Sequence, residues 1–279
     1  MVYIVLCVIA VLVIAFVVWQ NSRLVTVRKT IVTERLPVAF DGYKIAVISD
    51  LHKKTFGKDN ERLVLAIRQA DPDIIIFPGD LISRFETTIK PHKKFMSELL
   101  KTAPVYYTYG NHETDADEQM REDIKTLGMN CLLNCTDTIQ KDGQKINLCG
   151  LYFESKYYRN EKGGYRGLPK PSAEDIENCI GKKPEGFTLL LAHNPDYFKA
   201  YAKWGADITF CGHIHGGIIR IGNLGLLHPE RKLFPKYSEG VYTIGDHSMV
   251  LTAGLGKFRL FNPSEVMLVT LKGNRNDNL

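Results

Sequence analysis

Two histidines separated by one residue, His213 and His215, are the most distinctive chemical feature of this 279-residue sequence. Glycines flank them, and the apolar run 207–211 comes directly before. If that run is a strand, both rings point to the same side and can reach one centre from its C-terminal end. Imidazole is a common metal ligand, although two unrelated loop histidines are an equally good interpretation of this motif alone.

Four apolar runs upstream also end in polar side chains, namely Asp50 and His52, Asp80, Asn111 and His112, and His193. Carboxylates mixed with imidazoles suit Mn²⁺, Fe or Zn²⁺, whereas Ca²⁺ and Mg²⁺ favour oxygen ligands almost alone. The set is too large for one tetrahedral ion but suits two ions that share a carboxylate. Two ions about 3.5–4 Å apart would clamp a phosphoryl group and acidify a bridging water to a nucleophilic hydroxide.

The elements that must position these residues alternate between strand and helix. The apolar runs 44–49, 73–77 and 105–109 are followed by helix-like segments at 60–70, 91–101 and 115–127. This alternation predicts an α/β fold with a doubly wound sheet that is buried on both faces. Ligands of such sheets bind outside the carboxyl ends of the strands, which is where every polar cluster lies. Residues 24–28 alternate like an edge strand, and short strands dominate residues 130–271.

Five sequence blocks occur in one order: Asp50-x-His52, Gly79-Asp80, Gly110-Asn111-His112-Glu113, His193 and Gly212-His213-x-His215. Together they resemble the calcineurin-like metallophosphoesterase superfamily over residues 44 to about 270. Within that superfamily the sequence resembles the membrane-anchored bacterial phosphoesterases of the YkuE/YaeI type, and the apolar N-terminus supports that subgroup. The resemblance implies a four-layer β-sandwich of two mixed sheets flanked by helices, in place of one doubly wound sheet.

The resemblance also implies two divalent metal ions, with Mn²⁺ expected first and Fe or Zn²⁺ as alternatives. The implied ligand sets are Asp50, His52 and His215 for one ion, Asn111, His193 and His213 for the other, and Asp80 as the bridge between them. No other cofactor is expected.

His112 is implied as the catalytic residue, either as a general acid towards the leaving oxygen or as a phosphate-binding group. A histidine suits that role because its pKa lies near neutrality. Several family members have an Asp three residues after the bridging Asp, where it orients this histidine. Here that position is Ser83, which is neutral, so either Ser83 or Glu113 orients His112, or His112 contributes less to catalysis.

Residues 2–19 contain no charged side chain and end at Trp19. This length is at the lower limit for crossing a bilayer, and Trp is typical of the membrane interface. No Lys or Arg precedes the run and no Ala-x-Ala-like site follows it, which argues against a cleaved signal peptide. We therefore expect residues 1–22 to be a single-pass transmembrane anchor and residues 23–279 to be the catalytic domain, with its core at 44–271.

Basic residues follow the apolar run and none precedes it, so the positive-inside rule favours a catalytic domain on the cytoplasmic face of the cell membrane. The five cysteines beyond Cys7 fit a reducing compartment, although a Cys131–Cys135 pair stays open. The net charge of +5 is scattered rather than gathered in a nucleic-acid-binding stripe. The expected partners are therefore the membrane and a phosphate-ester substrate, including a nucleotide-linked lipid, and no nucleic acid.

Two functions remain in competition. The first is hydrolysis of phosphodiester or pyrophosphate bonds by attack of a metal-bridging hydroxide. The alternative is a catalytically weak membrane scaffold or interaction protein that retains the metal site structurally. Because every ligand position is filled, the enzyme is favoured. Three histidines outside the motifs are predicted to be surface or loop residues, namely His92, His228 and His247.

Overall fold

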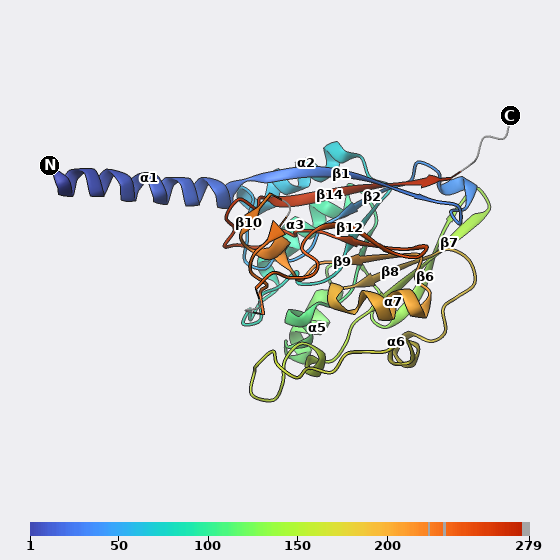
Figure 1. The fold of residues 1–279 in the computed structure, drawn as a ribbon. Helices are drawn as coiled ribbons and strands as arrows, with labels where there is room; N and C mark the ends of the chain where they lie inside the picture. Colours follow the sequence, from blue (N-terminus) through green and yellow to red (C-terminus); the bar gives the residue numbers. More distant parts are fainter. Residues whose placement is uncertain (223, 231–232, 275–279) are drawn as a thin grey trace.

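Two six-stranded mixed sheets pack face to face in the computed structural model, which describes residues 1–222, 224–230 and 233–274 (Figure 1). The first sheet has the strand order β1 (Leu24–Thr33), β14 (Ser264–Gly273), β2 (Lys44–Val47), β3 (Ile74–Phe77), β4 (Val105–Tyr107) and β5 (Asn130–Cys131). The second has the order β12 (Gly240–Ile244), β13 (His247–Leu251), β9 (Ile208–Cys211), β8 (Thr188–Ala192), β7 (Gln144–Leu151) and β6 (Cys135–Lys141). A short hairpin joins β10 (Arg220–Ile221) to β11 (Leu224–Gly225).

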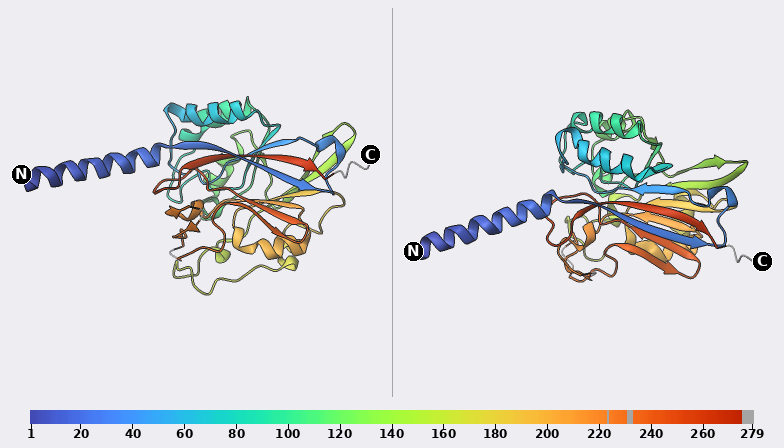
Figure 2. Two further views of the ribbon diagram at one scale, coloured as in Figure 1. Left: turned by 45° about the horizontal axis from the view of Figure 1, so that its top comes forward. Right: turned by 90° about the horizontal axis from the view of Figure 1, so that it is seen from above.

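Helices cover the outer face of each sheet. On the first sheet these are α2 (Glu61–Ala70), α3 (Lys90–Leu100) and α5 (Glu118–Lys125). On the second they are α6 (Ala173–Ile180) and α7 (Phe198–Trp204). The layers therefore run helix, sheet, sheet, helix (Figure 2).

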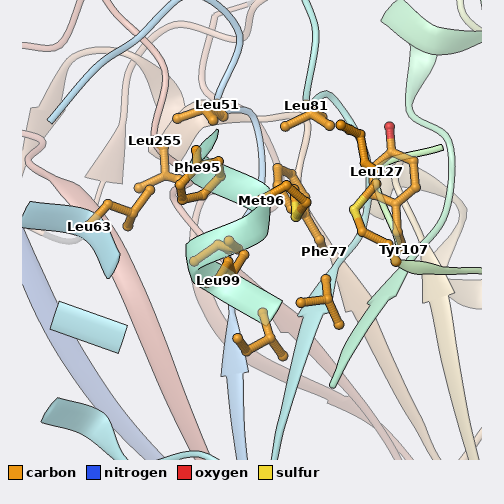
Figure 3. Close-up of a cluster of buried hydrophobic side chains, with 14 of the residues drawn as sticks. Leu51, Leu63, Phe77, Leu81, Phe95, Met96, Leu99, Tyr107, Leu127 and Leu255 are labelled. Atoms are coloured by element: carbon orange, nitrogen blue, oxygen red, sulfur yellow. The ribbon is translucent and has the colours of Figure 1, made fainter. Parts of the chain in front are cut away.

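The strand β3 shows why its sequence is uniformly apolar. Successive side chains of a strand point to opposite faces, and both faces of this strand are buried. Ile74 and Ile76 pack between the two sheets, whereas Ile75 and Phe77 pack under the helices. Figure 3 shows this second cluster, in which Phe77 lies beside Met96 of α3. Burial on both sides removes the polar alternation that a half-exposed strand would have.

The sandwich implied by the family resemblance is confirmed, whereas the single doubly wound sheet is wrong. Strand–helix alternation indicates that both faces of a sheet are covered, but it does not reveal that a second sheet covers one of them. The predicted helix at 115–127 is present but shorter, since α5 covers only Glu118–Lys125, and the separate short helix α4 (Asn111–Thr114) precedes it. The predicted edge strand is present and longer, since β1 pairs along its whole length with β14.

The N-terminal segment forms α1 (Val2–Ser22), a 21-residue helix of mean hydropathy 3.2 with none of its apolar window buried. At 1.5 Å per residue it is about 32 Å long, which matches the thickness of a bilayer core. Figures 1 and 2 show it projecting away from the domain and leading directly into β1. By length and composition, α1 is able to cross a membrane.

Candidate metal centre

The carboxyl ends of the parallel strands from both sheets meet at one end of the sandwich, which we call the site edge. β2, β3 and β4 are parallel in the first sheet, and β7, β8 and β9 are parallel in the second. Hydrogen bonds join the segments that follow them, because the backbone N–H of His213 donates to Asp50 Oδ1 at 3.1 Å. His193 Nδ1 also donates to the carbonyl of Pro78 at 2.7 Å.

Potential ligand atoms converge in three overlapping groups at the site edge, and within each group they lie within 4.8 Å of one another. The groups are Asp50 with His52 and His215, His52 with Asp80 and His112, and Asp50 with Asp80 and His193. Six of the eight residues predicted from the sequence therefore meet here. Each of the two carboxylates belongs to two of these groups.

Several of these residues have left-handed backbone, with φ of 56° at Asp50, 51° at His52, 58° at Asp80, 73° at His213 and 52° at His215. Positive φ is uncommon outside glycine and costs roughly 1–2 kcal/mol per residue. Strain of this kind concentrates at functional sites, where the surrounding structure maintains it. Here it turns the chain sharply after each strand.

His213 and His215 do not lie on a strand, so the predicted projection of both rings from one strand face is wrong. β9 ends at Cys211, and both histidines follow in the left-handed turn described above. His215 joins the group of Asp50 and His52, whereas the ring of His213 packs against His193 at 5.0 Å between centroids. The turn therefore directs the two side chains to different neighbours.

The donor atoms fit a divalent cation. His52 Nδ1 donates to the carbonyl of Ile82 at 3.0 Å, which leaves the lone pair of Nε2 directed into the site. Its Nε2 then lies only 3.3 Å from His215 Nε2, an arrangement that requires a shared proton or cation. Two buried atoms, His193 Nε2 and Asn111 Oδ1, have no hydrogen-bond partner among the described residues. Buried polar atoms of this kind are rare in native proteins unless a ligand satisfies them.

The electrostatics lead to the same conclusion. Burial raises the pKa of Asp50, but the nearby His215 and His193 outweigh it and hold that pKa below its usual range. Burial of Asp80 is likewise outweighed by His112, His193 and His52, so its pKa is well below normal. Both carboxylates are therefore ionised, although they are at most 2% exposed. Buried anions require neighbouring positive charge, which bound cations supply.

A family model described as calcineurin-like phosphoesterase matches residues 43–217, which contain all the predicted ligands. The chain belongs to this family. It is therefore a metallophosphoesterase, a hydrolase acting on phosphoric esters, as the motifs predicted.

Relatives of this phosphoesterase include two bacterial phosphoesterases and one transmembrane protein. It is 27% identical to the metallophosphoesterase YkuE of Bacillus subtilis, covering 88% of this chain and 85% of that protein. It is 26% identical to the phosphodiesterase YaeI of Escherichia coli, covering 77% and 75%. It is also 26% identical to a transmembrane protein with metallophosphoesterase domain from Danio rerio, covering 86% of this chain but only 55% of that one.

A solved structure supports the fold. A candidate 5′-nucleotidase from Staphylococcus aureus, in complex with alpha-ketoglutarate, superposes with a TM-score of 0.50 at 15% identity. The superposition covers 86% of this phosphoesterase and 56% of the other chain, so this phosphoesterase spans about half the length of that protein. At this identity the similarity concerns the fold alone.

The catalytic candidate His112 is oriented by neither Ser83 nor Glu113. The backbone N–H of Arg84 donates to its Nδ1 at 2.8 Å. The carboxylate of Glu113 instead accepts from the backbone N–H groups of Asp80, Ile82 and Gly110 at 2.8–3.0 Å. Glu113 therefore joins the segments that follow β3 and β4, and its effect on His112 is indirect.

Sequence reasoning missed several residues that line the cavity over the ligands, a space of about 540 Å³. They are Arg84, Tyr158, Tyr165, Glu230, Lys257 and Phe258. Glu230 Oε1 lies 3.2 Å from His213 Nε2 and thereby leaves Nδ1 of that ring for the site. These residues lie on loops without a periodic pattern, so the sequence carried no signal for them.

The histidines outside the motifs were predicted to be surface or loop residues, which is wrong for His92, because it is buried on α3, whereas His228 lies in a loop as predicted but is buried. His92 is 4% exposed and its Nε2 lies 2.8 Å from Glu86 Oε1. His228 is 2% exposed, and its ring lies 5.7 Å from that of His213. A single-sequence motif search does not detect burial of this kind.

Proposed function

We propose that this protein is a membrane-anchored phosphoesterase that hydrolyses phosphodiester or pyrophosphate bonds with two divalent metal ions. Residues 1–22 would be its anchor and residues 23–279 its catalytic domain. The observation that carries the proposal is the convergence of two buried, ionised carboxylates with four imidazoles at the site edge. When bound, two such ions neutralise the phosphate and make water a stronger nucleophile.

The distances support Asp80 as the bridging residue. A single atom, Asp80 Oδ2, lies 3.7 Å from His52 Nε2 and 3.3 Å from His193 Nε2. In the proposed assignment these imidazoles belong to different ions, with Asp50 and His215 beside His52. Asn111 Oδ1 and His213 Nδ1 complete the set around His193. Mn²⁺ is the preferred ion, because mixed oxygen and nitrogen ligands suit it, with Fe or Zn²⁺ as alternatives.

We assign His112 to phosphate binding rather than to general acid catalysis. Because its Nδ1 accepts from the Arg84 N–H, the hydrogen of the neutral ring is on Nε2. Burial lowers the pKa of His112 to about 4, so the ring is neutral near pH 7. A neutral Nε2–H donates a hydrogen bond well but transfers its proton poorly. The side chain is 23% exposed, so a phosphate oxygen can reach it from the cavity.

The decisive experiment combines metal stoichiometry with turnover. Chelator-stripped protein is reconstituted with Mn²⁺, Fe²⁺ or Zn²⁺, and bound metal and hydrolysis of bis-p-nitrophenyl phosphate are measured. We expect two ions per chain and metal-dependent turnover, both of which Asp80→Asn lowers. Asp137→Asn on the exposed strand β6 is the matched control and should change neither quantity. Turnover by the stripped protein, or unchanged stoichiometry in Asp80→Asn, contradicts the proposal.

The scaffold alternative makes a different prediction in the same system. A screen of phosphomonoesters, phosphodiesters and nucleotide-diphospho-lipids is applied to the reconstituted protein. If two ions bind and no compound in any class is hydrolysed, the site is structural and the enzyme proposal fails. The buried atoms His193 Nε2 and Asn111 Oδ1, which have no partner among the described residues, favour a metal site in both cases, so turnover alone separates the two functions.

The membrane assignment rests on α1 and on the basic residues that follow it. Arg23, Arg28 and Lys29 lie after the helix, which favours a cytoplasmic catalytic domain at the cell membrane. Cys135 on β6 is exposed and reports the face directly. A membrane-impermeant maleimide should label it only after the cells are permeabilised, with Cys135→Ser as the control. Labelling in intact cells would reverse the assigned orientation.

A further inference from the structure

The site edge and the exit of α1 lie at the same end of the sandwich. β1 starts at Leu24, directly after α1, and runs parallel to β14, so that Leu24 pairs with Ser264. β14 is antiparallel to β2, with Met267 opposite Val47. The first residue of β1 therefore lies at the end where β2 finishes and Asp50 follows. Figures 1 and 2 show α1 projecting from this end, so a bilayer crossed by α1 faces the metal centre.

The loop 256–261 is fixed against the end of α1. Asn21 makes two hydrogen bonds with the backbone of Arg259, through Oδ1 at 2.9 Å and Nδ2 at 3.1 Å. Lys54 Nζ donates to the carbonyl of Asn21. The ring of Phe16 on α1 lies 5.8 Å from that of Phe261. The loop is therefore held at the level at which the apolar helix leaves the domain.

Large apolar side chains are exposed on this loop and on the neighbouring hairpin. Phe258 is 83% exposed, Phe261 57%, Ile221 68% and Leu224 51%. The two segments are joined, because the N–H of Arg220 donates to the carbonyl of Leu260 at 3.1 Å. We call these four apolar residues the docking patch. Exposed apolar residues gathered in this way are typical of interaction sites.

Basic side chains lie beside Phe258 of the docking patch and at the end of α1. Lys257 is exposed beside Phe258, and Arg62 reaches the carbonyl of Ser22 at the end of α1. The guanidinium of Arg23 lies 5.2 Å from the ring centre of Trp19. Lysine, arginine and tryptophan next to an apolar surface are the composition of membrane-interface segments, where the cations attract anionic headgroups.

The same loop forms one wall of the cavity over the metal centre. Lys257 and Phe258 line that cavity together with His52 and His215. We infer that the docking patch seats the mouth of the site on the lipid bilayer that α1 crosses, so that the enzyme acts on phosphate esters of amphiphiles lying in that bilayer. The inference rests on the proposed function. It adds that the scissile phosphate reaches the metal centre from the membrane plane while its alkyl chains stay among the lipids.

Photocrosslinking tests the docking patch without requiring turnover. p-Benzoylphenylalanine is placed at Phe258 or Phe261 in the full chain, reconstituted in vesicles of phosphatidylcholine and phosphatidylglycerol at a 3:1 ratio. Val38 is the control, since it is 60% exposed and follows the far end of β1, about 30 Å from Leu24 at 3.3 Å per residue. We expect lipid adducts, detected by mass spectrometry, to be several-fold more abundant at 258 and 261 than at 38. Equal yields overturn the docking patch.

A pair of chromogenic diesters tests the substrate class. Ethyl and hexadecyl p-nitrophenyl phosphate share the scissile bond, and only the second enters vesicles. We expect Ile221→Ser/Leu224→Ser to lower hydrolysis of the hexadecyl ester several-fold and to leave the ethyl ester unchanged, whereas the control Val32→Ser/Val38→Ser changes neither. Equal effects on both esters overturn the inference. If neither ester is hydrolysed by the parent chain, the proposed function fails, and the adduct yields still decide whether the patch contacts lipid.

Discussion

Replacing Gly212 by Ala is the sharpest test of how the metal centre is assembled. Gly212 connects β9 to His213 and packs against the segment that follows β2. A Cβ at this position would overlap Ser49 Oγ and lie 2.7 Å from Asp50 Oδ2, where ordinary contact begins at 3.4 Å. The backbone φ here is not left-handed, so the clash is the only cost. The Asp50 carboxylate must retreat by about 0.7 Å, the difference between these two distances.

The expected magnitude follows from that displacement. Overpacking of a close contact costs about 1–3 kcal/mol, which corresponds to a fall of roughly 2–10 °C in the unfolding midpoint. A misplacement near 1 Å in an active site costs up to about 100-fold in rate. We therefore expect Gly212→Ala to lower turnover of bis-p-nitrophenyl phosphate by roughly 10- to 100-fold and to weaken binding of the ion assigned to Asp50.

The matched control is Gly164→Ala. Gly164 also lacks a left-handed φ, and its added Cβ would meet only the flexible side chain of Asn160 at 3.3 Å. Turnover, metal content and thermal unfolding are measured for both variants and the parent chain. If Gly212→Ala binds both ions and turns over within twofold of Gly164→Ala, the close approach of the two sheets does not set the position of Asp50.

Three further predictions concern protons and ions. His112→Ala should lower turnover about 100-fold, whereas His112→Gln should retain much more activity, because the amide can still donate a hydrogen bond. The turnover rate of the parent chain should not fall as pH rises through 6.5. If Gln is worse than Ala, or if the rate falls in that range, His112 acts as a general acid instead. Removing metal with a chelator should lower the unfolding midpoint by several degrees, because ionised Asp50 and Asp80 then lack cations, and added Mn²⁺ should restore it in calorimetry. Burial raises the pKa of Glu265 from 4.5 to about 7, so the folded chain binds this proton more tightly than the unfolded chain. The free energy of unfolding should therefore fall as pH rises from 4.5 to about 7. Glu265→Gln should make this fall smaller in urea titrations, and an unchanged dependence of the unfolding free energy on pH contradicts the prediction.

Local chemistry explains why much of the site was predictable. Asp50 and His52 follow a short apolar run, and such runs become buried strands whose ends bind ligands. The apolar helix α1 was predictable for a similar reason, because its composition alone determines its solubility in a bilayer. Arg84 was not predictable, since its contribution to His112 is a backbone N–H that any residue could supply.

The sequence by itself therefore determined which side chains can hold ions, because ligand chemistry belongs to residue types. Only the tertiary structure decided how those side chains are shared. Whether His213 and His215 point to one centre depends on backbone φ after β9, which no side-chain pattern encodes. Whether α1 leaves from the site edge depends on the pairing of Leu24 with Ser264, two residues far apart in the chain. Contacts between distant segments set both, and so the position of α1 relative to the site edge is a property of the fold.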